Sequence, residues 1–212
     1  MPPYTVAGKI LRRMKASRGA VWSAKDFLDV GTRASVDQAL RRLSVAETIR
    51  KVARGLYDYP QSGVLVGKRA PTALAIAKAA ARARGAQVRP TGAVAANALG
   101  LSTQVPARAE YITDGPSRQI SLGSRHIQLK RVSHKRLSLP AGAGALIEAL
   151  RYLGIDAVGN LTDSEIQRVS QALDAADIRK LRSAMHHAPD WMQPTIDAIV
   201  AAQAVKGSRH LK

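Results

Sequence analysis

The sequence predicts a helix-rich α+β protein, and three observations lead to that fold class. Of the 212 residues, 37 are alanine and only 8 are aromatic, which favours close packing of helices over an aromatic-rich β-sandwich. Several segments repeat apolar residues at helical spacing, and shorter segments alternate apolar with polar residues as strands do. Because the length exceeds the roughly 150 residues of a typical single domain, we expect two domains.

The first predicted elements are a helix, a short strand and a second helix. A basic amphipathic helix is predicted over residues 6–16, because its apolar residues recur every four positions. Residues 20–22 are apolar and predict a short strand. Ser23 follows at a position where its hydroxyl can cap a short helix through residues 25–28.

A third helix is the best-patterned element of the chain. Thr32 predicts its start, because a threonine side chain caps the first backbone N–H groups of a helix. Val36, Ala39, Leu40 and Leu43 then fall on one face. We expect this face to be buried.

A β-hairpin with a basic tip is predicted after the third helix. Residues 48–52 and 56–59 alternate apolar and polar side chains, and Gly55 in the turn at residues 53–55 permits a positive φ. A winged helix-turn-helix has this order of elements: helix, short strand, helix, turn, helix and hairpin. Residues 1–60 are therefore predicted to form a DNA-binding domain of that type.

The remainder is predicted to be a second, larger domain. Residues 61–70 contain two glycines without periodic apolar residues and predict a linker. Residues 71–205 predict a mixed α/β C-terminal domain that ends in helices, and residues 206–212 a disordered basic tail. Its expected helices cover residues 72–84, 91–99, 145–153, 163–173, 175–186 and 194–204, and its expected strands cover 87–89, 107–113, 118–122 and 126–132.

The charge of the chain is strongly positive and unevenly distributed. Lysine and arginine number 33 against 15 aspartate and glutamate residues, a net charge of +18. Residues 1–60 carry +7, residues 61–136 carry +11 and residues 137–212 are neutral. Solubility alone does not require such segregation, and we find no helix that carries this charge on one face with bulky apolar residues on the opposite face, as membrane-surface proteins do. A polyanion, and first of all DNA, is the expected partner.

The face of the third helix opposite its apolar stripe supplies the predicted base contacts. At 100° per residue this face collects Gln38 and Arg41, with Arg42 at its margin. Glutamine bonds adenine bidentately and arginine bonds guanine, whereas a flanking arginine more often binds phosphate. Arg33 and Ser35 lie in the first helical turn, where backbone N–H groups favour a phosphate. A merely solvated helix face is the alternative.

The predicted wing adds a second basic element. Arg50, Lys51 and Arg54 cluster on the hairpin, where a wing would lie beside the minor groove or the DNA backbone. A basic hairpin also protects the edge of a sheet, and winged helices also bind proteins, so these alternatives stay open. Helix and wing together are more specific than either alone.

The middle of the chain could extend this surface. Its basic residues face few acidic ones, and either additional DNA contacts or an RNA-binding or protein-docking role would use this charge. In the second case residues 61–136 would form the primary binding surface. Additional phosphate contacts are predicted at Arg89, Arg118, Arg125, Lys130 and Arg131.

No signature of catalysis accompanies this charge. The chain has no cysteine, which excludes disulfides and thiolate metal sites, and its five histidines form no metal-binding spacing. Phosphate-binding glycine loops and nucleophile elbows are likewise absent from the sequence. We therefore expect no enzyme activity, no catalytic residue, no metal and no cofactor. Without a long apolar segment, no membrane association is expected, and the location expected is the bacterial cytoplasm, at the nucleoid when DNA is bound.

Five runs of sequence match the pattern of a known family, namely residues 25–28, 36–43, 49–60, 92–106 and 111–118. They resemble the AbiEi-like antitoxins of bacterial toxin-antitoxin systems, in the branch known as DUF6088. The resemblance extends from about residue 6 to residue 201. The chain departs from the family pattern at Ala46 and Glu47, which replace the glycine-containing turn expected after the third helix.

The resemblance implies a type IV antitoxin with two activities. Its winged helix would bind inverted repeats in the promoter of its own operon and repress transcription. Its C-terminal domain would counteract a nucleotidyltransferase toxin of the AbiEii type without requiring a stable complex. Carried onto this sequence, the resemblance assigns DNA reading to Gln38, Arg41 and Arg42 and the wing to Arg50, Lys51 and Arg54.

Overall fold

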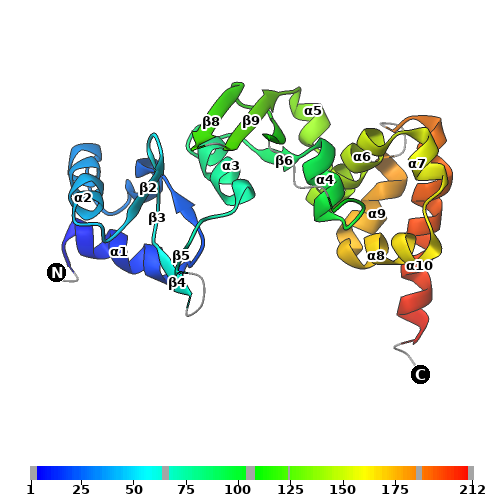
Figure 1. Cartoon of the computed structure of the whole chain (residues 1–212), viewed down its shortest axis with the longest axis horizontal. Coiled ribbons are helices and arrows are strands. Elements are labelled where there is room, and N and C mark those ends of the chain that lie inside the picture. The colour runs from blue at the N-terminus through cyan, green and yellow to red at the C-terminus, as the bar shows by residue number, and fades with distance from the viewer. Residues whose placement is uncertain (1–3, 64–66, 104–107, 124, 185–187, 210–212) are drawn as a thin grey trace. The chain divides into compact units, whose positions relative to one another are not determined.

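The computed structural model of the chain is an α+β fold, as the sequence predicts. It describes residues 4–63, 67–103, 108–123, 125–184 and 188–209 (Figure 1). Backbone contacts divide the chain into two compact units, which are described separately below. The first comprises residues 1–87 and 119–127, and the second comprises residues 88–118 and 128–212.

The first unit begins with the elements expected of a winged helix. They are α1 (Val6–Ala16), β1 (Val21–Trp22), η1 (Ala24–Phe27), α2 (Arg33–Val45), β2 (Arg50–Ala53) and β3 (Leu56–Asp58). The three strands form one antiparallel sheet in the order β1-β3-β2. Each predicted helix, strand and turn of this region is thus present, although η1 is a 3-10 helix rather than an α-helix.

Local side chains determine where these helices start. The Thr32 hydroxyl accepts the Ser35 N–H at 3.3 Å and caps α2, as its position in the sequence predicts. Ser23 and Asp26 form a capping box around the start of η1. Beyond the end of α2, Glu47 adopts a φ of 51°, the left-handed conformation that normally favours glycine. The glycine expected after this helix is therefore replaced by a residue that takes the same backbone conformation.

The apolar face of α2 is buried in the core of the first unit. Val36, Leu40 and Leu43 are each at most 2% exposed and pack with the interior residues of α1 and η1. That cluster includes Ile10 and Phe27. Burial of one such side chain contributes roughly 1.5–3 kcal/mol, so this stripe holds α2 in one orientation about its axis.

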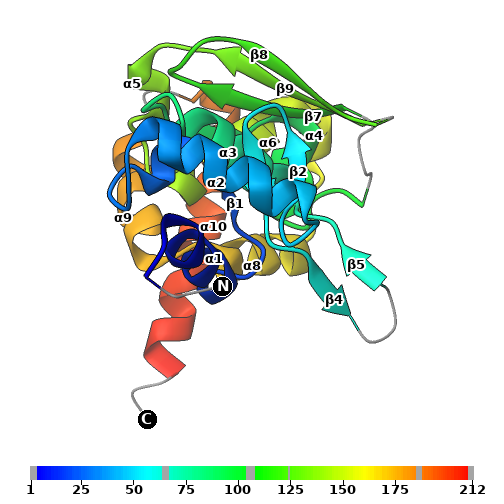
Figure 2. The same cartoon turned by 90° about the vertical axis from the view of Figure 1, so that its left-hand side faces the viewer.

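Two short strands lie within the segment that the sequence predicts to be a loose connector, residues 61–70. Strands β4 (Gln61–Gly63) and β5 (Gly67–Arg69) pair in antiparallel register and form a separate two-stranded sheet (Figure 2). Three-residue strands with terminal glycines show no alternation of apolar and polar side chains, which explains why the pattern missed them. The predicted domain boundary in this segment stays a prediction.

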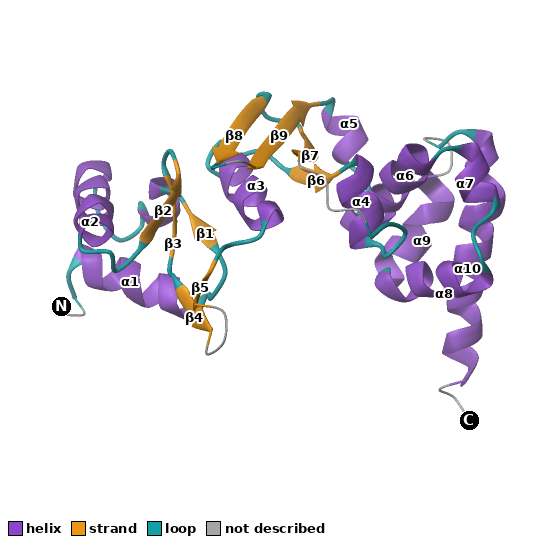
Figure 3. Ribbon diagram, in the orientation of Figure 1, coloured by secondary structure: helices purple, strands orange, loops and turns teal. Residues whose placement is uncertain are grey.

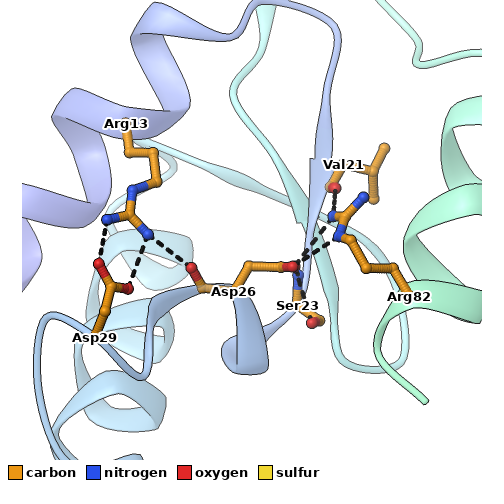
Figure 4. Close-up of polar contacts among 6 residues, drawn as sticks. All are labelled: Arg13, Val21, Ser23, Asp26, Asp29 and Arg82. Carbon is orange, nitrogen blue, oxygen red and sulfur yellow. Dashed lines mark hydrogen bonds and ion pairs between the residues drawn. The ribbon is translucent and has the colours of Figure 1, made fainter. Parts of the chain in front are cut away.

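Helix α3 (Ala73–Arg82) packs on the winged-helix sheet. It contacts β1 and β3, and its apolar side is an alanine-rich surface with Ile76 at 2% exposure. At its C-terminal end, the Arg82 guanidinium donates to the Asp26 carboxylate at 2.7 and 3.1 Å and to the Val21 carbonyl at 2.9 Å (Figure 4). A single arginine thus joins α3 to both β1 and η1.

The same Asp26 carboxylate also closes the capping box of η1. It accepts the Ser23 N–H at 2.7 Å and the Ser23 hydroxyl at 3.0 Å. Burial by itself would raise the pKa of Asp26, but the hydrogen bonds from Arg82 and Ser23 outweigh it and hold that pKa below its ordinary value. From α1, Arg13 donates to the Asp26 carbonyl at 2.8 Å and pairs with Asp29 (Figure 4).

The second unit combines strands with a set of helices (Figure 3). Strand β6 (Val88–Pro90) pairs antiparallel with β7 (Arg108–Thr113), in a four-stranded sheet of order β6-β7-β9-β8. Most of β8 (Arg118–Leu122) and the start of β9 (Arg125–Arg131) fall within residues 119–127, which are counted with the first unit. The helices are α4 (Gly92–Ala98), α5 (His134–Leu137), α6 (Ala141–Leu153), α7 (Ile155–Gly159), α8 (Asp163–Ala172), α9 (Ala175–Ala184), η3 (Asp190–Met192) and α10 (Gln193–Arg209).

Helix α6 lies at the centre of the second core. Leu146 and Leu150 are fully buried and pack with residues of α4, α8, α9 and α10, among them Val169 and Leu181. Short helices α5 and α7 were not expected, because four or five residues are too few to show a helical period. Helix α10 continues to Arg209, so the backbone of residues 206–209 is helical where the sequence predicts disorder. Residues 210–212 lie outside the described residues.

We expect Asp26→Ala to lower the free energy of unfolding by about 2 kcal/mol, because it removes charge-assisted bonds to Arg82 and the cap of η1. Urea denaturation at pH 7 measures this loss. Asp37→Ala is the matched control, since the Asp37 side chain is 51% exposed against 12% for Asp26 and pairs only with exposed Arg33 among the described residues. That control should cost at most about 0.5 kcal/mol, and equal losses in both variants would contradict the bridging role of Asp26.

We expect the stability difference between the wild type and Asp26→Asn to shrink in acid. The pKa of Asp26 is lower in the folded chain than in the unfolded chain, so ionised Asp26 stabilises the fold above the unfolded value, near pH 4. This contribution disappears as the pH falls through the lower folded value. Urea midpoints from pH 6 to pH 2.5 measure the effect, and a constant difference over that range would argue against it.

Candidate nucleic-acid interface

The outward face of α2 carries exposed side chains that suit DNA recognition. Because the stripe of Val36, Leu40 and Leu43 is buried, Gln38 and Arg41 lie on the opposite side at 100° per residue. Gln38, Arg41 and Arg42 are all exposed. Within the described part of the chain, none of these three side chains has a hydrogen-bond or ion-pair partner, so their polar groups are available to a ligand.

Val45 lies on the same outward face of α2 as Arg41, and the sequence analysis did not identify it as a candidate contact residue. It is the last residue of α2 and is 78% exposed, although valine is normally among the most buried residues. Its spacing of four residues from Arg41 could have placed it on this face, because residues four apart lie on the same side of a helix. An apolar side chain at this position suits contact with a thymine methyl group.

The first turn of α2 is less open to a phosphate than predicted. The Ser35 N–H is already accepted by Thr32, and the Ser35 hydroxyl donates to the Thr32 carbonyl at 2.8 Å. The Arg33 Nε donates to the Asp37 carboxylate at 2.8 Å, in an exposed pair four residues apart. The phosphate contact predicted at Ser35 stays a prediction, and it would have to replace these bonds to Thr32. Exposed Arg33 needs only to leave a weak surface pair.

In the wing, Lys51 and Arg54 are the exposed basic residues. Arg54 and Gly55 form the tip, where Gly55 adopts a φ of 74° that a side chain would disfavour. Neither cation has a partner among the residues that the structure describes. In both Figure 1 and Figure 2 the β2–β3 hairpin lies beside α2, so helix and wing can contact one duplex.

Arg50 has a structural role instead of the predicted DNA contact. Its guanidinium binds the Asp58 carboxylate with two hydrogen bonds and donates to the Arg69 carbonyl at 2.9 Å. The hydrogen bonds that Arg50 donates to Asp58 raise the pKa of Arg50, and the Asp58 side chain is only 4% exposed. Sequence reasoning missed this pair because an extra residue on β2, Val52, shifts the register and sets Arg50 opposite Asp58.

Arg89, a predicted phosphate contact, is buried, and that contact stays a prediction. Arg89 is 5% exposed, and its guanidinium donates to the carbonyls of Arg136, Leu137 and Leu139. Burial lowers the pKa of Arg89, and the nearby charge of Glu148 counteracts this effect in part. The side chain therefore holds the chain segment after α5 and is not part of an exposed basic surface.

The other basic residues of the middle segment differ in their availability. Lys130 pairs with Glu110 at 2.9 Å, and Arg118 is partly buried and takes part in an interaction within the protein. Arg131 is exposed. Only the backbone of Arg125 is described, so its predicted contact lies outside the described residues. Of the five predicted phosphate contacts, Arg131 is the one that the geometry leaves most accessible.

Two further kinds of site were searched for in the described residues. No group of three or more histidine, aspartate or glutamate side chains there could hold a metal ion. None of the helices in the described segments is long and apolar enough to cross a membrane.

Comparisons with known proteins give one family and one structural neighbour. The family described as "Family of unknown function (DUF6088)" matches residues 9–178. No curated protein matches the chain. The crystal structure of the RV2827C protein from Mycobacterium tuberculosis is similar at 16% sequence identity and a TM-score of 0.44, over 93% of this chain and 82% of that one.

We expect Arg50→Ala to lower the free energy of unfolding by about 1–3 kcal/mol, because it leaves the buried Asp58 carboxylate without its cation. Lys51→Ala removes the same charge at the next residue of the same strand. Its free energy of unfolding should stay within about 0.5 kcal/mol of the wild-type value. Urea denaturation measures both. Equal stability of the two variants would exclude the structural role of Arg50.

Proposed function

Since the chain belongs to the DUF6088 family, a family of unknown function, we propose a function from the geometry of its first unit. The protein binds double-stranded DNA through α2 and the β2–β3 wing and represses its own operon. The observation that carries this proposal is the exposed face of Gln38, Arg41 and Arg42, which lies opposite a fully buried stripe. A helix held in one orientation can present these side chains to the major groove.

The two elements have different tasks in this proposal. Gln38 and Arg41 read base edges, because an amide bonds adenine bidentately and a guanidinium bonds guanine. Lys51 and Arg54 on the wing, with Arg42 and Arg33 at the margins of α2, bind phosphates and contribute affinity without sequence preference. Binding should therefore weaken steeply with salt, since each neutralised phosphate releases a counterion.

We further propose that the protein is an antitoxin. The resemblance to AbiEi-like antitoxins supports this role, with a nucleotidyltransferase as the toxin and no stable complex required. The test is growth of bacteria that express a nucleotidyltransferase toxin of the AbiEii type, with and without the protein. Restored growth supports the role, and unrelieved toxicity at equal expression contradicts it.

The alternative, in which residues 61–136 form the primary surface for RNA or a protein, has less support. Several basic side chains of this segment have partners inside the protein and do not contribute a free charge. Arg82 binds Asp26, Lys130 binds Glu110 and Arg136 binds Glu148. Tighter binding to RNA than to any DNA duplex would nevertheless favour this alternative.

We expect the double variant Gln38→Ala/Arg41→Ala to lose its preference for the upstream DNA of its own reading frame over a shuffled duplex of equal length. Each bidentate base contact contributes roughly 1–3 kcal/mol, so the wild-type preference should fall at least tenfold while nonspecific binding remains. Arg54→Ala should instead weaken binding to both duplexes to a similar extent. Fluorescence anisotropy at low and physiological salt measures both effects.

The control for this experiment is Arg179→Ala, an exposed residue of α9 in the second unit. It removes the same charge as Arg54→Ala and should leave both affinities near those of the wild type. Equal losses on upstream and shuffled DNA in the double variant would contradict base reading. A wild type without any preference at physiological salt would reject the repressor function itself.

A further inference from the structure

The second unit contains a pocket that the proposed DNA interface does not use. It has a volume of about 260 Å³ and lies against β6, α5 and α6. Its lining is amphipathic, with Leu139 and Ile147 as apolar residues and four charged side chains. The charged residues are Arg89, Arg136, Glu148 and Arg151.

The single carboxylate of this lining is occupied by one of the arginines. Glu148 is buried, and it accepts Arg136 Nε at 2.9 Å and Nη2 at 2.7 Å. It also accepts the Thr91 hydroxyl at 2.8 Å. With three arginines and one glutamate, the lining carries two positive charges more than negative ones.

Arg89 is the buried cation of the pocket and forms no ion pair within the described residues. Its hydrogen bonds end on backbone carbonyls, which carry no net charge. Asp177 is near enough for its charge to act on Arg89, but its carboxylate accepts the Ala143 N–H at 2.9 Å and is not part of the lining. A buried charge without a bonded counterion is costly, so an anion in the pocket would stabilise this arrangement.

The backbone of α6 makes room for the guanidinium. Gly144 lies directly against it, and a Cβ at this position would overlap the Arg89 side chain. The position of the cation therefore depends on a residue without a side chain. Any larger residue would push Arg89 out of the pocket wall.

We propose that this pocket binds a phosphomonoester, the dianion of a phosphate attached to one small organic group. Guanidinium groups form bidentate bonds to phosphate oxygens, and a phosphomonoester carries about −1.5 to −2 charges at pH 7, close to the excess charge of the lining. Leu139 and Ile147 offer an apolar wall to the organic group. The volume lies below the roughly 300–1,000 Å³ of sites for drug-sized ligands, which suits a small ester.

Two sources would supply this chemistry, a free mononucleotide and the 5′-phosphate end of a nucleic acid. Isothermal titration calorimetry of the full chain with AMP, adenosine, and a tetrathymidylate with and without its 5′-phosphate separates them. We expect saturable binding of AMP or of the phosphorylated oligonucleotide, and none of adenosine or the unphosphorylated oligonucleotide. The phosphorylated ligand that binds identifies the source.

Matched variants decide whether binding occurs at the pocket. Arg151→Ala removes a lining arginine and should weaken binding about tenfold or more, whereas Arg179→Ala removes the same charge outside the pocket and should leave binding unchanged. Ser133→Glu, an exposed lining position, should weaken binding by adding a negative charge. The proposal is overturned if the folded wild type binds no phosphomonoester saturably, or if Arg151→Ala and Arg179→Ala behave alike. These outcomes are independent of DNA binding by the first unit.

Discussion

Burial of one face of α2 is the constraint on which the first unit depends. Val36, Leu40 and Leu43 fill the space between α1 and η1, and a rotation of α2 about its axis would expose them to water. The same burial directs Gln38 and Arg41 outward. The orientation of a recognition surface is thus a consequence of hydrophobic packing on the far side of the helix, and the polar residues themselves need no internal contact to be held in place.

A net charge of +18 overstates the free positive charge of this protein. Arg13, Arg82, Arg89 and Arg136 each bind backbone carbonyls or carboxylates. The bonds of Arg82 and Arg89 connect elements that lie far apart in the sequence. Arginine suits this task because its planar fork donates several hydrogen bonds at fixed angles. Arg41 and Arg42 of α2 and Lys51 and Arg54 of the wing are exposed and have no ion pair among the described residues. Lys9 and Arg12 of α1 likewise have none there.

The order of the elements in the first unit could be predicted from sequence because local rules determine it. The spacing of apolar residues predicts α1 and α2. Thr32 predicts the start of α2, because its hydroxyl accepts a hydrogen bond from the N–H three residues later. The roles of Arg50 and Arg89 could not be predicted in this way. The partner of Arg50 depends on a bulge at Val52, and the partners of Arg89 are carbonyls 47 to 50 residues away. Propensity and periodicity carry no information on such distant pairings.

The packing of α3 on the winged-helix sheet bears on how the chain could be divided. Arg82 lies over the Trp22 ring at 6.0 Å and bonds to Asp26, and the apolar side of α3 is buried. A fragment that stops at residue 60 would keep every winged-helix element but would expose the surface that α3 covers. The smallest piece that retains these contacts runs through α3, so the unit that evolution could transplant as a whole is larger than the winged helix it contains.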